Sequence, residues 1–313
     1  MNENERILVT GGTGFVGSHL LRLLVSQGFK QLHTTSFSGE ESSLPEVTVH
    51  KVDLRDATQT EALFKEVMPT QVYHLASIAS VGNSFEIAHQ LLADNTSLQL
   101  SVLNAAKNQT PNTRFLQVSS AELYGVSDED ELPIREDHPL KPINPYGVSK
   151  ATQELLAAMY QRVYGMKIVI VRPFNHIGEG QAPAFAVPAF VKQIIAIEKG
   201  AEPVVEVGNL AAVRDFTDVK DVVKGYVLLM EKGVVGQVYN LGSGKGVAIS
   251  TVLESLLQLS TTKIEIRVLQ EKLRPLDIPV SISDNEKLQK LGWQPSIALT
   301  ETLERILESE RQI

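Results

Sequence analysis

The chain has 313 residues, of which 43% are hydrophobic and 21% are charged, an ordinary composition for a globular protein that is long enough for two domains. The net charge of −8 argues against a general nucleic-acid binder, and the absence of cysteine excludes disulfides, thiolate metal sites and cysteine nucleophiles. The acidic segment Met1–Glu5 is unlike a signal peptide, and no apolar run approaches the roughly 20 residues that span a bilayer. We therefore expect a cytoplasmic protein without a metal, a nucleic-acid partner or a membrane partner.

The first predicted elements are a short buried strand at Arg6–Thr10 and an amphipathic helix from Ser18 to about Gln27. Between them lies the sequence Gly-Gly-Thr-Gly-Phe-Val-Gly, residues 11–17. Glycines at a strand–helix junction are typical of a turn that binds the phosphates of a dinucleotide. The first glycine permits the tight turn, the next lets the backbone approach a pyrophosphate, and the last allows close helix–strand packing. A plain glycine turn is the alternative, and the position at the first junction favours the dinucleotide site.

Further strand-like runs alternate with helical patterns at Gln31–Ser36, Thr48–Val52, Gln71–Ala76, Arg114–Ser119 and Lys167–Arg172. Repeated strand–helix units predict a parallel sheet that is covered by helices on both faces. Ligands of such sheets bind at the carboxyl ends of the strands. Polar side chains fall at these ends, namely Asp53, Ser77, Ser119 and Ser120.

The pattern loosens beyond Phe174, where prolines interrupt the apolar segments. We predict a helix from about Asp221 to Glu231, a strand and turn at Gln237–Gly242, and a final helix from about Leu299. The predicted fold class is α/β, a Rossmann-type doubly wound parallel sheet with a smaller interleaved α/β C-terminal substrate lobe. Residues 1–173 and about 212–236 would form the dinucleotide-binding domain, and about 174–211 and 237–313 the substrate-binding lobe.

Tyr146 and Lys150 are four positions apart, which places both side chains on one face of a helix. An ammonium near a phenol favours the phenolate, so we expect Lys150 to lower the pKa of Tyr146 from its usual value of about 10. Tyr146 would then exchange a proton with a substrate hydroxyl or carbonyl near neutral pH. An exposed pair on a solvated face is the alternative, and the glycine turn favours the catalytic interpretation.

Four motifs together resemble the extended short-chain dehydrogenases/reductases that act on nucleotide sugars: the glycine turn, His-Leu-Ala at 74–76, Ser-Ser-Ala-Glu-Leu-Tyr-Gly at 119–125, and the Tyr146/Lys150 pair. The resemblance covers essentially the whole chain. Within that family, residues 172–178, 207–210, 213–219 and 273–275 resemble the GDP-mannose branch. The similarity is greatest to its reductases, which convert GDP-4-keto-6-deoxy-D-mannose to GDP-D-rhamnose.

The resemblance implies a mechanism for the catalytic residues. Hydride from the nicotinamide of NADPH or NADH would go to C4 of the keto sugar, and Tyr146 would protonate the oxygen. Ser120 would donate a hydrogen bond to that oxygen, and Lys150 would hold the nicotinamide ribose. A serine that only caps the turn after its strand is the alternative for Ser120.

The resemblance also assigns binding residues. Those expected at the cofactor are Gly11, Thr13, Gly14, Phe15, Val16, Gly17, Ser36, Asp53, Leu54, Leu75, Ala76, Ser77, Asn95, Val118, Tyr146, Lys150 and Pro173. Those expected at the substrate are Ser80, Ser120, Glu122, Asn175, Val187, Lys192, Val207, Asn209, Arg214, Arg274 and Asp277.

Several of these assignments have a structural alternative. Asp53 would contact adenine, or instead cap the turn before Arg55. Arg214 and Arg274 are the best diphosphate ligands, because a guanidinium binds phosphate oxygens bidentately, although either could be a solvated surface charge. Asp277 would meet the ribose of the sugar nucleotide. Two further residues stay undecided, Lys192 between phosphate and solvent and His176 between substrate contact and strand end.

The choice between NADPH and NADH depends on the end of the second strand, Thr35–Ser38, which carries neither a carboxylate nor an arginine. A missing carboxylate removes repulsion against a 2′-phosphate, and hydroxyls can hydrogen-bond to it. We therefore favour NADPH slightly, and NADH stays open.

Three functions remain in consideration. The first is the 4-ketoreductase. The second is a GDP-mannose 4,6-dehydratase or another nucleotide-sugar epimerase or dehydratase, because Glu122 matches the position of the dehydratase base. Glu122 could also be a structural carboxylate. The third, a non-catalytic nucleotide-binding regulator, is disfavoured by the intact Ser120, Tyr146 and Lys150. The family resemblance further implies a GDP-sugar partner and a homodimer formed through helices around Asn95–Lys107 and Tyr146–Tyr164.

Overall fold

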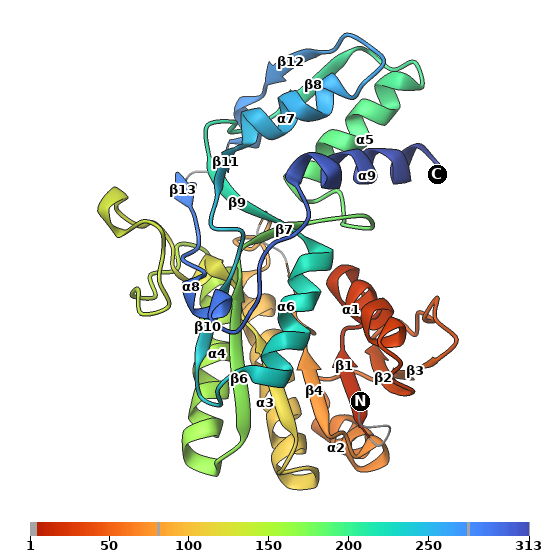
Figure 1. Cartoon of the computed structure of the whole chain (residues 1–313), viewed down its shortest axis with the longest axis vertical. Helices are drawn as coiled ribbons and strands as arrows, with labels where there is room; N and C mark the ends of the chain where they lie inside the picture. The colour runs from red at the N-terminus through yellow and green to blue at the C-terminus, as the bar shows by residue number, and fades with distance from the viewer. Residues whose placement is uncertain (1–4, 80–81, 274–275, 313) are drawn as a thin grey trace.

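The computed structural model describes residues 5–79, 82–273 and 276–312. Two predicted substrate residues, Ser80 and Arg274, lie outside the described residues. A large parallel sheet with its helices fills the lower part of Figure 1, and a smaller α/β lobe lies above the carboxyl ends of its strands.

The main sheet has seven strands in the order β10-β6-β5-β4-β1-β2-β3, and all of its neighbouring strands are parallel. The predicted α/β fold class with a doubly wound sheet is therefore confirmed. Six of its strands were predicted to within two residues at each end. The strands are β1 (Arg6–Thr10), β2 (Gln31–Ser36), β3 (Val47–Lys51), β4 (Gln71–His74), β5 (Arg114–Val118), β6 (Lys167–Pro173) and β10 (Val238–Leu241).

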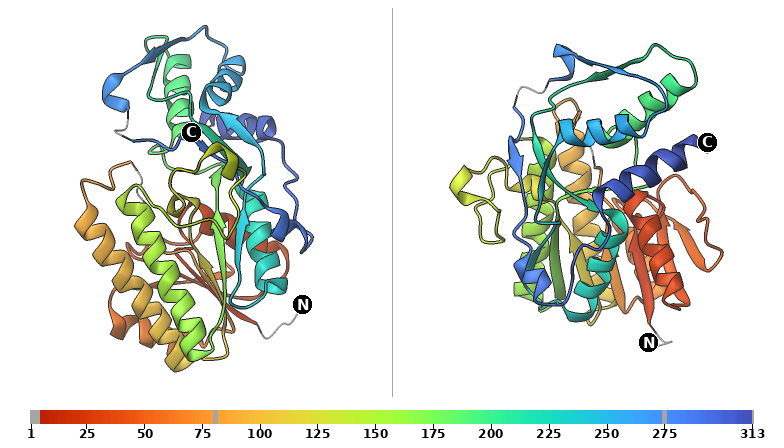
Figure 2. Two further views of the ribbon diagram at one scale, coloured as in Figure 1. Left: turned by 90° about the vertical axis from the view of Figure 1, so that its left-hand side faces the viewer. Right: turned by 45° about the horizontal axis from the view of Figure 1, so that its top comes forward.

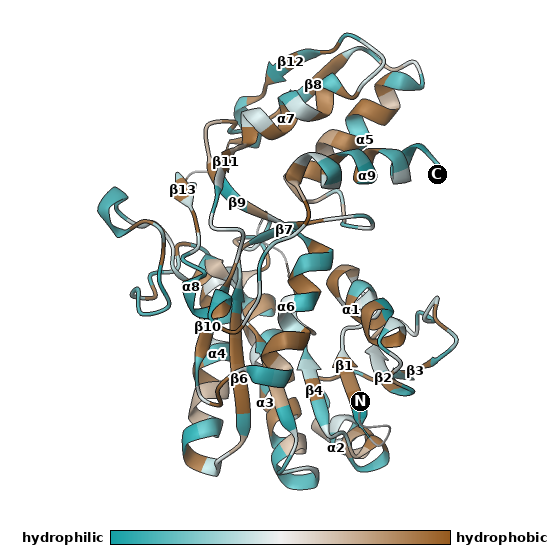
Figure 3. Ribbon diagram, in the orientation of Figure 1, coloured by the Kyte–Doolittle hydropathy of each residue, from teal (hydrophilic) through white to brown (hydrophobic). Residues whose placement is uncertain are grey.

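Helices cover both faces of this sheet because its strands are apolar on both sides. Figure 3 shows the hydrophobic colour along β1 and β6. On one face, α2 (Ala57–Val67), α3 (Ala88–Gln109) and α4 (Pro145–Tyr164) bury Leu8 and Phe115. On the other, α1 (Phe15–Ser26) and α6 (Val219–Lys232) bury Val9 and Leu116. The helices α3 and α4 lie side by side in the left view of Figure 2.

The smaller lobe contains two short sheets and three main helices. The four-stranded sheet consists of β7 (Asn175–Ile177), β9 (Val213–Asp218), β11 (Gly246–Ala248) and β13 (Val280–Ser281). The two-stranded sheet pairs β8 (Val204–Val207) with β12 (Glu265–Val268). A second hydrophobic core is formed mainly by α5 (Ala186–Glu198), α7 (Ile249–Gln258) and α9 (Leu299–Arg311), whereas α8 (Glu286–Gln289) contacts β10.

Two strands differ from the predicted division into domains. β10, expected in the substrate lobe, pairs in parallel with β6 at the edge of the main sheet. β9, expected in the dinucleotide-binding domain, belongs to the sheet of the lobe. Along the chain, α6 connects β9 of the lobe to β10 of the main sheet. Local sequence patterns do not show which sheet a strand joins.

No helix in the three described ranges is long and apolar enough to cross a membrane.

Candidate active site

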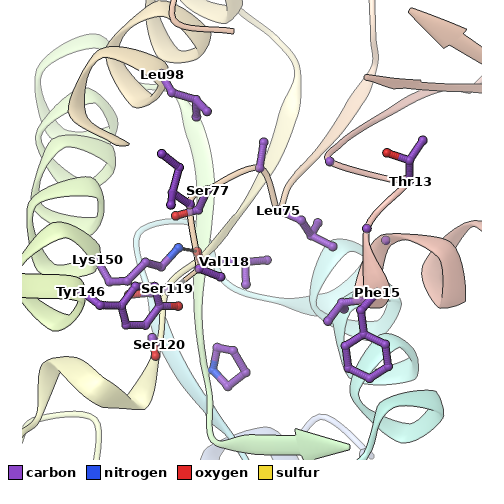
Figure 4. Close-up of a pocket in the computed structure, with 18 of the residues that line it drawn as sticks. Thr13, Phe15, Leu75, Ser77, Leu98, Val118, Ser119, Ser120, Tyr146 and Lys150 are labelled. Atoms are coloured by element: carbon purple, nitrogen blue, oxygen red, sulfur yellow. Dashed lines mark hydrogen bonds between the residues drawn. The ribbon is translucent and has the colours of Figure 1, made fainter. Parts of the chain in front are cut away.

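A cavity of about 760 Å³ opens at the carboxyl ends of the main strands. Every residue that the sequence assigned to the cofactor lines it, with the exception of Asn95. Three predicted substrate residues, Ser120, Glu122 and Asn175, also line it. In Figure 4, Tyr146, Lys150 and Ser120 lie on one side of the cavity and Thr13 and Phe15 on the other. The fold thus brings the glycine turn and the predicted catalytic residues to one site.

Asn95 differs from its predicted role as a cofactor ligand. Its side chain is fully buried, accepts a hydrogen bond from the Ile78 N–H (2.8 Å) and donates one to the Ser149 hydroxyl (3.1 Å). The amide therefore ties the segment after β4 to α4, behind the cavity wall. Its partners lie 17 and 54 residues away in the chain, so no local sequence pattern indicates this role.

The glycine turn is as tight as its sequence predicted. Gly11 has a φ of +71°, and the Gly14 N–H donates to the Gly11 carbonyl at 3.2 Å. A Cβ atom on Gly17 would lie 2.4 Å from the Gly11 oxygen and 2.5 Å from the Gly12 Cα, so no larger residue fits. The helix α1 begins directly after Gly14, and its first residues line the cavity. The N–H groups of this first helical turn have no partner within the helix and are available to a ligand there. This arrangement suits the pyrophosphate of a dinucleotide.

The start of α4 positions Tyr146 and Lys150. The Asn144 side chain caps the helix by accepting a hydrogen bond from the Gly147 N–H at 2.7 Å, and Pro145 stands at the first helical position, where its fixed φ is favourable. Lys150 is 4% exposed and donates from Nζ to the Val118 carbonyl of β5 at 2.8 Å. The predicted shared helix face is therefore turned toward the strand ends.

The pKa of Tyr146 differs from the expectation. Burial and, to a smaller extent, the nearby Glu122 raise this pKa to about 12, although a hydrogen bond with the Ser120 hydroxyl lowers it in part. Lys150 donates from its ammonium to the Val118 carbonyl, and burial lowers the pKa of Lys150 to about 8. Tyr146 is therefore protonated at neutral pH, the state that a proton donor requires.

Ser120 and Glu122 have structural contacts as well as positions in the cavity wall. The Ser120 hydroxyl accepts a hydrogen bond from the Glu122 N–H at 3.2 Å, so it caps the short turn Ala121–Leu123. The Asn144 side chain donates to the Glu122 carboxylate at 2.9 Å. Both residues therefore make structural hydrogen bonds and also line the cavity.

The far end of the cavity carries a cluster of charges. Asp53 accepts hydrogen bonds from the Arg55 N–H (3.0 Å) and guanidinium (2.8 Å), which lower the pKa of Asp53. Arg55 also pairs with Asp94 at 2.9 Å and lies over the ring of Phe37. Asp53 therefore caps the turn before Arg55 and lines the cavity at the same time. The Ser36 hydroxyl accepts from two N–H groups of the loop after β2.

Most of the other predicted substrate residues lie in the small lobe, outside this cavity. Arg214 pairs with Asp277 at 2.8 Å and donates to the Ile278 carbonyl at 2.6 Å. Asn209 donates to the other Asp277 oxygen at 3.1 Å, so the three predicted residues form one polar cluster. Lys192 is exposed on α5.

The predictions for Val187 and Val207 need a correction. Both side chains are 1% exposed and belong to the second hydrophobic core, so they face away from any ligand surface. Only their backbone is left to contact a substrate. The apolar pattern of the helix around Val187 and of the strand around Val207 is typical of buried side chains. The family resemblance had instead favoured a contact of both residues with the ligand.

Several residues of the cavity wall were missed by the sequence analysis. Thr35, Phe37 and Arg55 stand next to predicted residues and follow from the same strand ends. Gln181 and Tyr226 also line the cavity, and no motif marks either one. His176, left undecided, lines the wall with its ring stacked on that of Phe15 at 6.1 Å between centroids.

Comparison with known proteins identifies the class. Residues 8–306 match the family described as GDP-mannose 4,6 dehydratase. The chain is 33% identical to the GDP-6-deoxy-D-mannose reductase of Pseudomonas aeruginosa over 97% of this chain and 96% of that protein. Among solved structures, RMD from Pseudomonas aeruginosa complexed with NADPH is 30% identical with a TM-score of 0.86 over 99% of both chains. The UDP-glucose 4-epimerase of Thermus thermophilus in complex with NAD is 29% identical with a TM-score of 0.87, covering 98% of this chain and 99% of that one.

The fold and the site define an NAD(P)-dependent enzyme of the extended short-chain dehydrogenase/reductase class, in the nucleotide-sugar branch, as the sequence motifs predicted. Within this class, the chain belongs to the GDP-mannose 4,6 dehydratase family.

The turn geometry predicts the effect of Gly17→Ala. The added methyl group collides with backbone atoms that cannot move independently, so we expect a loss of about 1–3 kcal/mol in the free energy of unfolding. Cofactor affinity should fall as well, because the turn must shift. Gly82→Ala is the control, since a Cβ there has no neighbour within 4 Å. Denaturant unfolding and fluorescence titration with NADPH measure both effects, and equal behaviour of the two variants would contradict the packing argument.

Proposed function

We propose that the protein reduces the C4 keto group of GDP-4-keto-6-deoxy-D-mannose to give GDP-D-rhamnose, with NADPH or NADH as the reductant. The observation that carries this proposal is the single cavity in which the glycine turn lies opposite Ser120, Tyr146 and Lys150. Further support comes from the similarity to a relative named GDP-6-deoxy-D-mannose reductase.

In this proposal each residue acts at a stated atom. A reduced nicotinamide, when bound, supplies the hydride. Tyr146 donates its proton to the C4 oxygen, and the Ser120 hydroxyl donates a hydrogen bond to the same oxygen as negative charge develops there. Lys150 holds the cofactor ribose through its buried ammonium, and the Val118 carbonyl orients that ammonium.

The substrate would extend from this cavity toward the small lobe. Asn175 stands at the cavity edge as a contact for the sugar. We place the GDP part near the cluster of Asn209, Arg214 and Asp277, where the guanidinium would bind the diphosphate and the carboxylate the ribose hydroxyls. Asp277 would then hold Arg214 in position for the phosphate.

We also propose a homodimer formed through α3 and α4. Apolar side chains of α4 are left on the surface, with exposed fractions of 60% for Leu155 and 63% for Val163. The two helices lie side by side on one face of the molecule (Figure 2), and pairing with a second copy would cover these residues.

Glu122 supports a second candidate function, the GDP-mannose 4,6-dehydratase. Its carboxylate lines the cavity beside Ser120 and Tyr146 and is held by Asn144. A dehydratase needs a base there to remove the C5 proton after C4 is oxidised. The name of the matching family also points to this reaction.

The proton donor is tested by Tyr146→Phe. Loss of the phenolic proton should lower turnover by roughly 10²–10⁴-fold, the usual contribution of a positioned acid. Binding of GDP should stay nearly unchanged, because Tyr146 lines the cavity and the proposed diphosphate site lies outside it. Steady-state kinetics with the 4-keto sugar and calorimetry with GDP measure the two quantities. Near-normal turnover would exclude Tyr146 as the acid.

Glu122→Gln separates the two candidate reactions. A ketoreductase needs only a hydride and one proton at the C4 oxygen, so this variant should retain activity within about 10²-fold of the wild type, the lower end for acid–base groups. The wild type should consume NAD(P)H stoichiometrically with the 4-keto sugar and leave GDP-mannose unchanged. Conversion of GDP-mannose without added reductant, abolished in Glu122→Gln, would establish the dehydratase instead.

The charges at the far end of the cavity predict a weak cofactor preference. Arg55 is the cation near the predicted adenosine site, but Asp53 and Asp94 offset its charge. We expect kcat/KM for NADPH to exceed that for NADH by less than about tenfold, which corresponds to 1.4 kcal/mol. Arg55→Ala should lower the NADPH value more than the NADH value. A ratio above 10² in either direction would show that another group selects the cofactor.

A further inference from the structure

Tyr226 carries a hydroxyl group that the fold of the described residues leaves without a partner. The residue lies on α6, its side chain is 0% exposed, and its OH has no hydrogen-bond partner within the described ranges. A buried hydroxyl without a partner is destabilising, and phenylalanine at this position would avoid that cost. The same side chain lines the active-site cavity. A ligand in the cavity is therefore the available partner for this hydroxyl.

The surroundings of Tyr226 indicate which part of a ligand it meets. Its ring belongs to the hydrophobic core between the main sheet and the helices α1 and α6. Val118 is buried in that core and Val16 packs against it, and both also line the cavity. Tyr226 thus brings a phenol to an apolar part of the wall. Such a wall suits a flat ring with one polar substituent.

Tyr226 also lies near the predicted proton donor. Burial raises the pKa of Tyr226 strongly, and the Tyr146 side chain adds to the increase. Tyr226 is therefore protonated at neutral pH and available as a donor. The glycine turn and the charge cluster at Asp53 are the predicted sites of the pyrophosphate and the adenosine. The reacting ring of the cofactor belongs beside Tyr146.

We propose that the Tyr226 hydroxyl donates a hydrogen bond to the carboxamide of the nicotinamide and so fixes the ring beside Tyr146. This inference rests on the proposed use of NADPH or NADH. In this proposal Tyr226 contacts the cofactor and not the sugar, so its role is to position the cofactor. Val16, Val118 and Pro173 would supply the apolar surface for the ring.

The test compares ligands with and without the nicotinamide in Tyr226→Phe. NADH is paired with ADP-ribose, and NADPH with 2′-phospho-ADP-ribose, which are the same nucleotides without the base. We expect the variant to bind NADH and NADPH about three- to tenfold more weakly, as the loss of one hydrogen bond implies. The affinity for the two truncated nucleotides should stay within about twofold, because they lack the carboxamide. Calorimetry measures all four constants without any sugar substrate, so a failed reductase assay leaves this test intact.

The matched control is Thr217→Val. Thr217 also carries a buried hydroxyl with no partner among the described residues, but it does not line the cavity. Removing its hydroxyl should leave all four affinities unchanged. Thermal unfolding of the ligand-free variants should show no loss of stability for Tyr226→Phe, since an unsatisfied group is removed. Equal weakening of all four ligands, unchanged NADH and NADPH binding, or the same effect in Thr217→Val would each overturn the proposal.

Discussion

The position of α4, the helix that carries Tyr146 and Lys150, depends on a buried ion pair between Arg172 of β6 and Glu154 of α4. Each residue is 5% exposed, and the Arg172 Nε donates to the Glu154 carboxylate at 3.1 Å. Tyr146, Lys150 and Glu154 follow one another at four-residue intervals on the same helix face. The pair therefore fixes the rotation of α4 relative to the sheet and directs Tyr146 toward the strand ends. Removing one partner would leave an unpaired buried charge, which typically costs about 3–5 kcal/mol.

The same arginine connects the site to the edge of the sheet. Its guanidinium donates to the Tyr124 hydroxyl at 2.7 Å, and Tyr124 donates to the Asn240 side chain at 2.6 Å. Asn240 lies on β10 and also donates to the Ile134 carbonyl at 2.8 Å. This buried polar network adds side-chain contacts to the backbone pairing of β10 with β6. β10 forms backbone hydrogen bonds with β6 and supplies Asn240 as a polar partner for Tyr124. Both contacts hold β10 in the main sheet, although β9 before it in the chain belongs to the lobe.

The sequence predicted those features that depend on neighbours in the chain. The glycine turn, the strands that precede it and follow it, and the Tyr146/Lys150 spacing are local patterns, and the structure brings them to one cavity. The features that were missed depend on contacts across long separations. Asn95 bonds to Ser149, Tyr226 reaches the cavity from a helix without a motif, and β10 pairs with β6, a strand distant in sequence.

The expected effect of Lys150 on Tyr146 shows a similar limit. Spacing on a helix predicts that the two groups share a face, but not which acceptor the ammonium chooses. Here it donates to the Val118 carbonyl, while the dominant influence on the Tyr146 pKa is burial. The burial that sets the Tyr146 pKa comes from the packing of the whole fold, which helix spacing alone does not predict.

Glu122 is the residue at which the two candidate reactions diverge. Asn144 binds the Glu122 carboxylate and also caps the helix that carries Tyr146, so the carboxylate and the phenol keep a fixed relationship. The Glu122 charge raises the pKa of Tyr146 and thereby stabilises its protonated form. A protonated tyrosine suits reduction of a ketone, in which the oxygen gains a proton. Oxidation of a hydroxyl, the first step of a dehydratase, needs the tyrosine as a base, and the same carboxylate then opposes the required ionisation. Glu122 therefore acts on Tyr146 in opposite senses in the two candidate reactions.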